Sequence, residues 1–250
     1  MEKELVSIIM PSYQSGLYIA DAINSVMRQT YPHWELLITD DASSDNSVQI
    51  INAFTSQDER IRLFQLEQNS GVATARNHSI QQAKGRYIAF LDSDDCWHPA
   101  KLEKQLAFMQ QHLHAFTFTA YQLMNSNGQL LNKTIPVPAK ISYQHYLGNT
   151  IIGCLTVMID REKIKHISMP NLKMSQDMAL WLSILRNGVT AYGLGEVLAY
   201  YRLNPNSNTA NKIKAAVYVW KVYRNHEKLS PVSSLRHLIK YAFHAVKKRL

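Results

Sequence analysis

The chain has 250 residues, 46% of them hydrophobic, so it can bury a substantial core without disulfides or a structural metal. Its two cysteines are too few for an extracellular disulfide framework, and we expect a reducing, cytoplasmic environment. The formal net charge is +8, but residues 212–250 hold ten Lys or Arg and one acid, which leaves 17 bases and 18 acids elsewhere. A neutral body with a basic C-terminal segment is typical of a protein that contacts an anionic surface, lipid or nucleic acid.

No apolar run approaches the roughly 18 residues that span a bilayer, and the charged start of the chain predicts no signal peptide. The first hundred residues alternate apolar runs with helical periodicity, which predicts a mostly parallel, Rossmann-like α/β sheet flanked by helices. The predicted strands are Leu5–Met10, Trp34–Thr39, Ile61–Gln65 and Tyr87–Leu91, and the predicted helices are Tyr18–Gln29, Asn46–Thr55 and Val72–Gln82.

The pattern after Pro99 is less regular. It predicts helices at Lys101–His112 and Asp177–Asn187, strands at Ala115–Met124, Leu130–Ile135, Leu155–Ile159 and Ala191–Tyr201, and a loop at 204–209. The segment Ser234–Leu250 carries an apolar stripe that contains Leu235, Leu238, Ile239, Ala242, Val246 and Leu250. Two interpretations stay open: a basic amphipathic helix on a membrane surface, or a helix packed on the core with a solvated basic face.

Polar clusters follow three of the predicted strands directly: Pro11–Tyr13, Asp40–Asp45 and Asp92–Asp95. Because parallel strands gather their carboxyl ends at one sheet edge, these clusters should converge. Crowded carboxylates repel one another, so we expect a cation among them, and oxygen ligands suit Mg²⁺ or Mn²⁺ holding a diphosphate. The alternative is that such Asp-rich loops only cap helices and form turns.

At this point the sequence resembles family 2 glycosyltransferases of the GT-A fold over roughly residues 4–204. The motifs that carry the resemblance are Val6–Tyr13 with Ala22–Tyr31, Asp40–Asp45, Asn69–Asn77, Gly85–Asp95 and Gln176–Leu182, in the family's order and spacing. The resemblance implies three parts: a nucleotide-binding half at 1–98, an acceptor-binding half at 99–205, and a basic helical tail at 206–250.

The resemblance also implies residue roles. Pro11, Ser12 and Tyr13 match the loop that cradles the nucleotide base, Asp41 the acid that accepts a uracil N–H, and Arg76 a diphosphate contact, which together favour a UDP-sugar donor. The run Asp92, Ser93, Asp94 matches the D-x-D motif that contacts ribose and metal, and Asp94 and Asp95 are the metal candidates.

Asp177 matches the general base of inverting members, which deprotonates the acceptor hydroxyl; its alternative use is as an acid that complements the helix dipole. Two departures stand out. Gln176 replaces an acid that many relatives carry, and no His occurs in Tyr201–Ser207, so Asn204 or water would take its place near the metal. The Gln-x-x-Arg-Trp motif of processive synthases is absent, which favours transfer of a single sugar.

The resemblance is strongest to bacterial enzymes that extend lipid-linked saccharides for O-antigen, capsule or teichuronic acid synthesis. It implies a hexose, either glucose, galactose or an N-acetyl form, transferred to a polyprenyl-diphosphate-linked acceptor by a peripheral protein at the inner membrane face. Trp181 is a candidate for the acceptor surface, and the basic patch Lys247, Lys248 and Arg249 for lipid contact.

Two other classes of function compete with this interpretation. A sugar-phosphate nucleotidyltransferase would share a metal-dependent nucleotide site, but it needs a basic, Gly-rich loop after the first strand, and the loop Pro11–Gly16 has no basic residue. A non-catalytic protein could use the basic tail to bind membrane or nucleic acid. Nucleic acid is disfavoured, because the acidic loops would repel phosphate and no nucleic-acid motif occurs.

Overall fold

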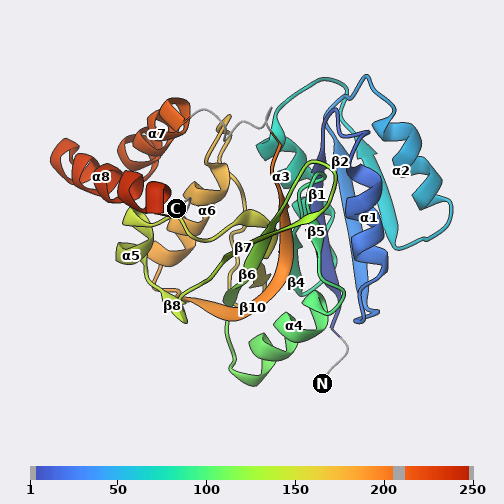
Figure 1. The fold of residues 1–250 in the computed structure, drawn as a ribbon, viewed down its shortest axis with the longest axis horizontal. Coiled ribbons are helices and arrows are strands. Elements are labelled where there is room, and N and C mark those ends of the chain that lie inside the picture. The colour runs from blue at the N-terminus through green and yellow to red at the C-terminus, as the bar shows by residue number, and fades with distance from the viewer. Residues whose placement is uncertain (1–3, 205–211, 248–250) are drawn as a thin grey trace.

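The computed structural model describes residues 4–204 and 212–247. One sheet runs through the molecule with the strand order β3-β2-β1-β4-β9-β6-β10-β5, and helices cover both of its faces (Figure 1). The predicted α/β class is confirmed.

The N-terminal half is the predicted parallel unit. Its strands are β1 (Val6–Ser12), β2 (Trp34–Asp40), β3 (Ile61–Gln65) and β4 (Tyr87–Phe90), and the crossover helices are α1 (Ile19–Met27), α2 (Ser47–Thr55) and α3 (Val72–Gln82). Side chains of β1 alternate between the two faces: Ile9 packs in the core under α3, and Ile8 and Met10 pack in the core under α1. Because these strands run parallel, the loops that follow β1, β2 and β4 lie at the same carboxyl edge of the sheet.

The second half extends the same sheet with mixed pairing. It comprises β5 (Cys96–Trp97), α4 (Lys101–Gln111), β6 (Phe116–Met124), β7 (Leu130–Ile135), β8 (Lys140–Ile141), α5 (Tyr143–Gly148), a 3₁₀ turn η1 (Cys154–Thr156), β9 (Met158–Asp160), α6 (Gln176–Arg186) and β10 (Ala191–Arg202). Strand β9 lies antiparallel between β4 and β6, whereas β10 runs parallel to β6. The strand predicted at Leu155–Ile159 begins only at Met158, because the preceding residues form the 3₁₀ turn.

The C-terminal segment packs onto this body through α7 (Lys212–Lys221), a π-helical turn η2 (Val222–His226) and α8 (Pro231–Lys247). Val222 and Tyr223 are fully buried in the main core, and the Tyr223 hydroxyl donates to the Leu147 carbonyl of α5. Leu238 and Tyr241 of α8 also pack against the main core, so the interpretation of a helix packed on the core holds for one face of α8. The predicted loop at 204–209 lies almost wholly outside the described residues.

None of the helices in residues 4–204 and 212–247 is long and apolar enough to cross a membrane.

A buried lysine joins α4 to the η1 turn. Lys101 is fully buried, its ammonium lies 4.9 Å from the Trp97 ring centroid, and it donates to the Gln105 side chain and to the Thr156 carbonyl at 3.2 Å. Burial lowers the pKa of Lys101 to about 7, because the charged form loses its hydration.

We expect Lys101 to make stability depend on pH. Between pH 7 and 10 the unfolded chain holds a proton on Lys101 that the folded chain has lost, so the free energy of unfolding should rise with pH, by at most about 1.4 kcal/mol per unit. Urea unfolding of wild type and Lys101→Met at pH 7, 8 and 9 measures the difference, which should change in favour of wild type as pH rises. If the free energies of unfolding of the two proteins changed with pH by the same amount, the lowered pKa of Lys101 would be contradicted.

Candidate active site

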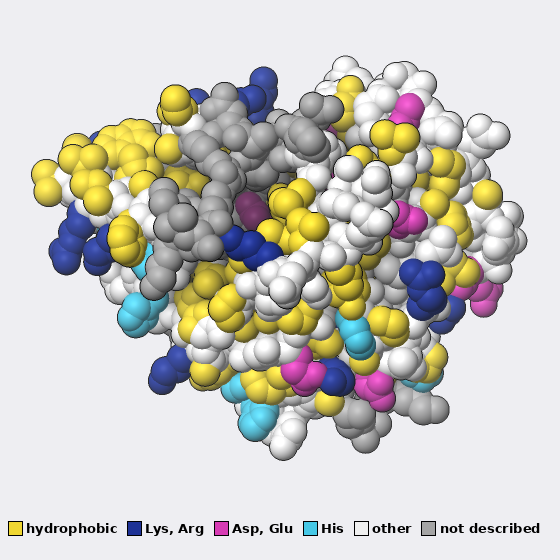
Figure 2. Space-filling model, in the orientation of Figure 1, with side chains coloured by type: hydrophobic (Ala, Val, Ile, Leu, Met, Phe, Trp, Pro, Cys, Tyr) yellow, Lys and Arg dark blue, Asp and Glu magenta, His cyan; other side chains and the backbone are white. Residues whose placement is uncertain are grey.

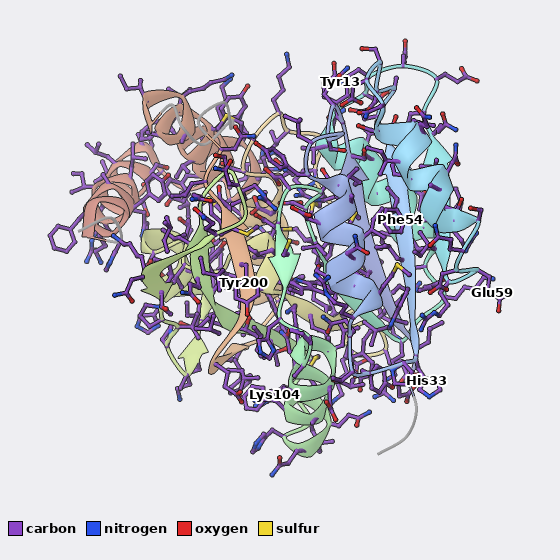
Figure 3. All side chains as sticks on the ribbon, turned by 45° about the vertical axis from the view of Figure 1, so that its right-hand side comes forward. Tyr13, His33, Phe54, Glu59, Lys104 and Tyr200 are labelled. Carbon is purple, nitrogen blue, oxygen red and sulfur yellow. The ribbon has the colours of Figure 1, made fainter. Side chains whose placement is uncertain are left out.

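The loops after β1 and β2 meet at the carboxyl edge of the sheet. The Ser12 hydroxyl donates to Asp40 Oδ1 at 2.9 Å, and the Ser43 amide donates to Asp40 Oδ2 at 2.8 Å. The carboxylate of Asp40 is thus a structural tie between the loops. Tyr13, at the end of β1, keeps 52% of its surface exposed, and Figure 3 shows it at the end of the molecule opposite Lys104 and His33. An exposed ring at this place is available to stack on a planar ligand.

Asp41 connects the β2 loop to the start of α3. Its two carboxylate oxygens accept the amides of Ser70 and Gly71 at 2.7 and 2.8 Å, and Gly71 has a φ of 92°, in the left-handed region that favours glycine. Each carboxylate oxygen offers two lone pairs, so one further donor can still bind. This geometry is compatible with the predicted contact to a base N–H.

Arg76 lies on α3 and is buried beside the acidic loop. Its Nη2 pairs with Asp92 Oδ1, and its Nη1 lies 3.8 Å from the sulfur of Met169. Its Nε has no hydrogen-bond partner among the described residues. Arg76 therefore keeps a fixed donor that an anionic ligand could satisfy.

The acidic loop that follows β4 concentrates negative charge. Burial, with repulsion from Asp92, raises the pKa of Asp94 to about 6. Burial raises the pKa of Asp95 still more strongly, and Asp94 and Asp92 add to that effect. Asp92 and Asp94 are partly exposed, whereas Asp95 is buried and accepts the Arg202 amide at 2.8 Å. The partly exposed carboxylates of Asp92 and Asp94 could receive a cation. Asp95 was also predicted as a metal ligand, but it is buried and holds the Arg202 amide, so a role in supporting the loop fits it better.

Arg202, the last residue of β10, holds this loop from the other half of the molecule. Its side chain donates to the carbonyls of Asp94 and Ser126 at 2.7 and 3.0 Å and to Asp21 Oδ2 at 3.0 Å, and its guanidinium lies 4.7 Å from the Tyr18 ring centroid. Arg202 was not among the site residues predicted from the sequence. Its long-range partners are far apart in sequence, so no local motif reveals the contact.

Asp177 lies in the first turn of α6, close to Arg76. Burial raises the pKa of Asp177, while the charge of Arg76 opposes that rise and the charge of Asp92 adds to it. The preceding Ser175 has a φ of 61°, a left-handed conformation that non-glycine residues rarely adopt and that recurs at functional sites. Arg76 thus connects the loop after β4 with the start of α6.

A pair of hydrogen bonds holds the segment before α6 against α3. The side-chain amide of Asn77 donates to the Met169 carbonyl and accepts the Met169 amide, both at 2.7 Å. The two halves of the molecule therefore meet at Arg76 and Asn77, which are neighbours on one helix.

The structure corrects the expectation that Trp181 lies at an acceptor surface. Its side chain is fully buried, with ring centroids 5.4 Å from Phe90 and 5.2 Å from Phe116, so it belongs to the core. Lys247 is the last residue of α8, and Lys248 and Arg249 lie outside the described residues.

The carboxylates at this edge suit a cation whose ligands come partly from the protein and partly from a bound substrate, rather than a cation held by protein ligands alone. Within residues 4–204 and 212–247 no cluster of three or more His, Cys, Asp or Glu could hold a metal ion. Mg²⁺ and similar ions are commonly bound by one or two carboxylates together with substrate phosphates. Asp92 and Asp94 meet that requirement, so the residues present fit a cation that arrives with a diphosphate.

Comparison with known proteins agrees with this geometry. Residues 7–166 match Glycosyl transferase family 2. The chain belongs to this family. A Bacillus subtilis (strain 168) protein, TuaG, named as a teichuronic acid biosynthesis glycosyltransferase, is 52% identical over 248 residues, which cover 99% of this chain and 98% of that protein. An Escherichia coli protein is 40% identical, with 99% and 96% coverage, and is named UDP-Glc:alpha-D-GlcNAc-diphosphoundecaprenol beta-1,3-glucosyltransferase WfgD.

Solved glycosyltransferases share the fold. Staphylococcus aureus TarS (residues 1–349) with UDP-GlcNAc superimposes with a TM-score of 0.70 at 20% identity, covering 95% of this chain and 71% of that one. The mannosyltransferase PcManGT from Pyrobaculum calidifontis, with GDP-Man and Mn²⁺, gives 0.71 at 16% identity, with 97% and 70% coverage. The expected GT-A fold is confirmed, and the protein is a glycosyltransferase.

Arg202→Lys should lower kcat/KM about 10- to 100-fold, because a lysine cannot reach the Asp94 carbonyl, the Ser126 carbonyl and Asp21 together, and the acidic loop loses its position. Initial rates of glycosyl transfer, with a melting curve to confirm folding, measure the effect. Arg60→Lys is the matched control, because Arg60 pairs with Asp58 at the protein surface. A folded Arg202→Lys protein with the wild-type rate would contradict the assigned role.

Proposed function

We propose that the protein transfers a single glucose from UDP-glucose, with inversion, to a lipid-diphosphate-linked saccharide in bacterial surface polysaccharide synthesis. The observation that carries the proposal is the placement of Asp177 beside Arg76, which itself pairs with Asp92 of the acidic loop. The names of the two full-length relatives support the pathway, and that of WfgD supports the donor and the acceptor.

The donor would lie across the carboxyl edge of β1, β2 and β4. Tyr13 would stack on the uracil with Pro11 and Ser12 behind it, and Asp41 would accept the base N–H through a free lone pair. The Asp92–Asp94 segment, Ser93 included, would face ribose and diphosphate. The Nε of Arg76 would donate to a phosphate oxygen.

Asp94, with Asp92 beside it, would hold Mn²⁺ or Mg²⁺ together with the diphosphate of the donor. Asp95 would keep the loop in place. When bound, the cation offsets phosphate charge and stabilises the leaving nucleoside diphosphate. The raised pKa of Asp94 supports this assignment, because a bound cation would offset both of its causes, first the burial of the carboxylate and then repulsion from Asp92.

Asp177 would act as the general base. Its carboxylate would take the proton of the acceptor hydroxyl as that oxygen bonds to the anomeric carbon, while the bond from that carbon to the diphosphate oxygen breaks and UDP leaves. One displacement converts an α-linked donor into a β-linked product. Arg76 and the amide of Met178 favour the ionised carboxylate that a base requires.

The acceptor would be a polyprenyl-diphosphate-linked saccharide, and the protein would work as a peripheral protein on the inner face of the cytoplasmic membrane. Its basic C-terminal segment supports that location, because each Lys or Arg near an anionic leaflet contributes about 1 kcal/mol of attraction.

UDP release from a panel of UDP-sugars with Mn²⁺, with and without a water-soluble N-acetylglucosamine diphosphate acceptor, tests the proposal. UDP-glucose should be turned over with acceptor stimulation. Asp177→Asn should lower kcat about 10³-fold with UDP binding retained, since only proton transfer is lost. Asp94→Asn should weaken Mn²⁺-dependent UDP binding as well.

Glu59→Gln is the control, because Glu59 is an exposed acid far from Tyr13 (Figure 3) and should leave both readings unchanged. Absence of turnover with every UDP-sugar would refute the donor assignment. An Asp177→Asn protein with the wild-type kcat would refute the assigned base. Pyrophosphate release from UTP and a sugar phosphate would instead establish a nucleotidyltransferase.

A further inference from the structure

An apolar stripe on α8 faces outward. Val232, Leu235, Ile239 and Phe243 are 80%, 53%, 62% and 66% exposed, and their spacing of three or four residues places them on one side of the helix. We call these four residues the α8 ridge. Large apolar side chains exposed in a continuous row are unusual on a soluble surface and indicate an interaction site.

The inward face of α8 is already satisfied by other residues. Ser234 is fully buried, and Leu238 and Tyr241 pack against the main core. The residues of α8 that pack against the core lie on a different side of the helix from the ridge. The ridge is therefore not the side of α8 that the core requires. Helix α7 adds the exposed Ile213 and Val217, and Figure 2 shows apolar side chains gathered over this end of the molecule.

The charge around the ridge is of one sign. Residues 212–250 contain a single acid, Glu227, which is buried, accepts the Tyr143 hydroxyl at 2.7 Å and lies 3.4 Å from Arg186. The exposed Arg236 and Lys240 follow Leu235 and Ile239 directly along α8. The described part of α7 and α8 therefore combines exposed apolar and basic side chains with no exposed acid.

We propose that the α8 ridge is a membrane-docking surface for bilayers that contain anionic lipid. Helix α8 lies in the plane of the interface, with the ridge at the boundary of the acyl chains and the flanking basic side chains among the headgroups. A second copy of the chain fits this surface less well, since pairing two such surfaces would bring like charges together.

The surface lies one helix away from the candidate base. Helix α5 contacts both α8 and α6, and the side chain of Lys240 lies against α5 at Gly148. Burial raises the pKa of the Tyr146 phenol of α5, and the charge of nearby Asp177 adds to that rise. Docking through the ridge therefore holds the acceptor-side half of the site near the membrane. This inference deepens the proposed function, on which its biological purpose rests.

Flotation of the purified full chain with vesicles of phosphatidylcholine, with or without phosphatidylglycerol, tests the surface without any acceptor. Wild type should bind the anionic vesicles, and the triple variant Leu235→Ser, Ile239→Ser, Phe243→Ser should bind at least about tenfold more weakly. Arg236→Gln should weaken binding and its salt dependence. Leu113→Ser is the matched control, because Leu113 is 76% exposed beyond α4 and should leave binding unchanged.

Wild type that fails to bind anionic vesicles, or a triple variant that binds as wild type does, would overturn the proposal. Sedimentation that shows a wild-type dimer and a monomeric triple variant, without vesicle binding, would assign the ridge to a second copy instead. The triple variant should keep its rate on a water-soluble acceptor. If neither wild type nor the triple variant is active on that acceptor, the proposed function fails. The vesicle experiment still shows whether the ridge binds membranes.

Discussion

Repulsion among carboxylates at one sheet edge is the constraint on which this structure depends. Asp92, Asp94 and Asp95 follow one short strand, and two buried arginines hold them. Arg76 pairs with Asp92, whereas Arg202 donates from its side chain to the Asp94 carbonyl and from its backbone amide to the Asp95 carboxylate. The arginines fix the loop, but burial and then repulsion from Asp92 still raise the pKa of Asp94 to about 6. Such an acidic loop is compatible with the proposed binding of a metal-bound diphosphate, whose cation would offset the negative charge.

The same contacts explain why the chain forms one body. Arg202 is the last residue of β10, a strand of the second half of the sheet. Its partners Asp21 and Asp94 belong to the first half. Asn77 makes the corresponding connection on the other face, where it binds the main chain before α6. Arg76 belongs to the first half of the sheet and Asp177 to the second half. A movement of one half relative to the other would therefore separate Asp177 from Arg76.

Much of this arrangement was predictable from sequence. Continuous apolar runs located β1, β2 and β4, because every residue of these three strands is buried. The helical spacing of apolar residues located the helices between them. The polar loops could be placed together because parallel strands share a carboxyl edge. Short elements escaped: β5 and β8 are two residues each, too short for a period, and their pairing with β10 is set by tertiary contacts.

The roles of residues whose partners are distant in sequence were not predicted either. Arg202 is an ordinary strand residue by sequence, and only the fold brings it to Asp94. Trp181 was a candidate for the acceptor surface, yet it fills the core beside Phe90 and Phe116. The stripe on α8 was visible, but sequence could not show that Leu238 turns inward while Ile239 stays exposed.

The most direct test of the central claim is a crystal structure with UDP and Mn²⁺, with the metal located by anomalous scattering. We expect one strong peak within coordination distance of an Asp94 carboxylate oxygen and of both phosphates, with Arg76 on the diphosphate. UDP bound at the edge of β1 and β2 with no metal at Asp94, or a metal at a different set of residues, would contradict it.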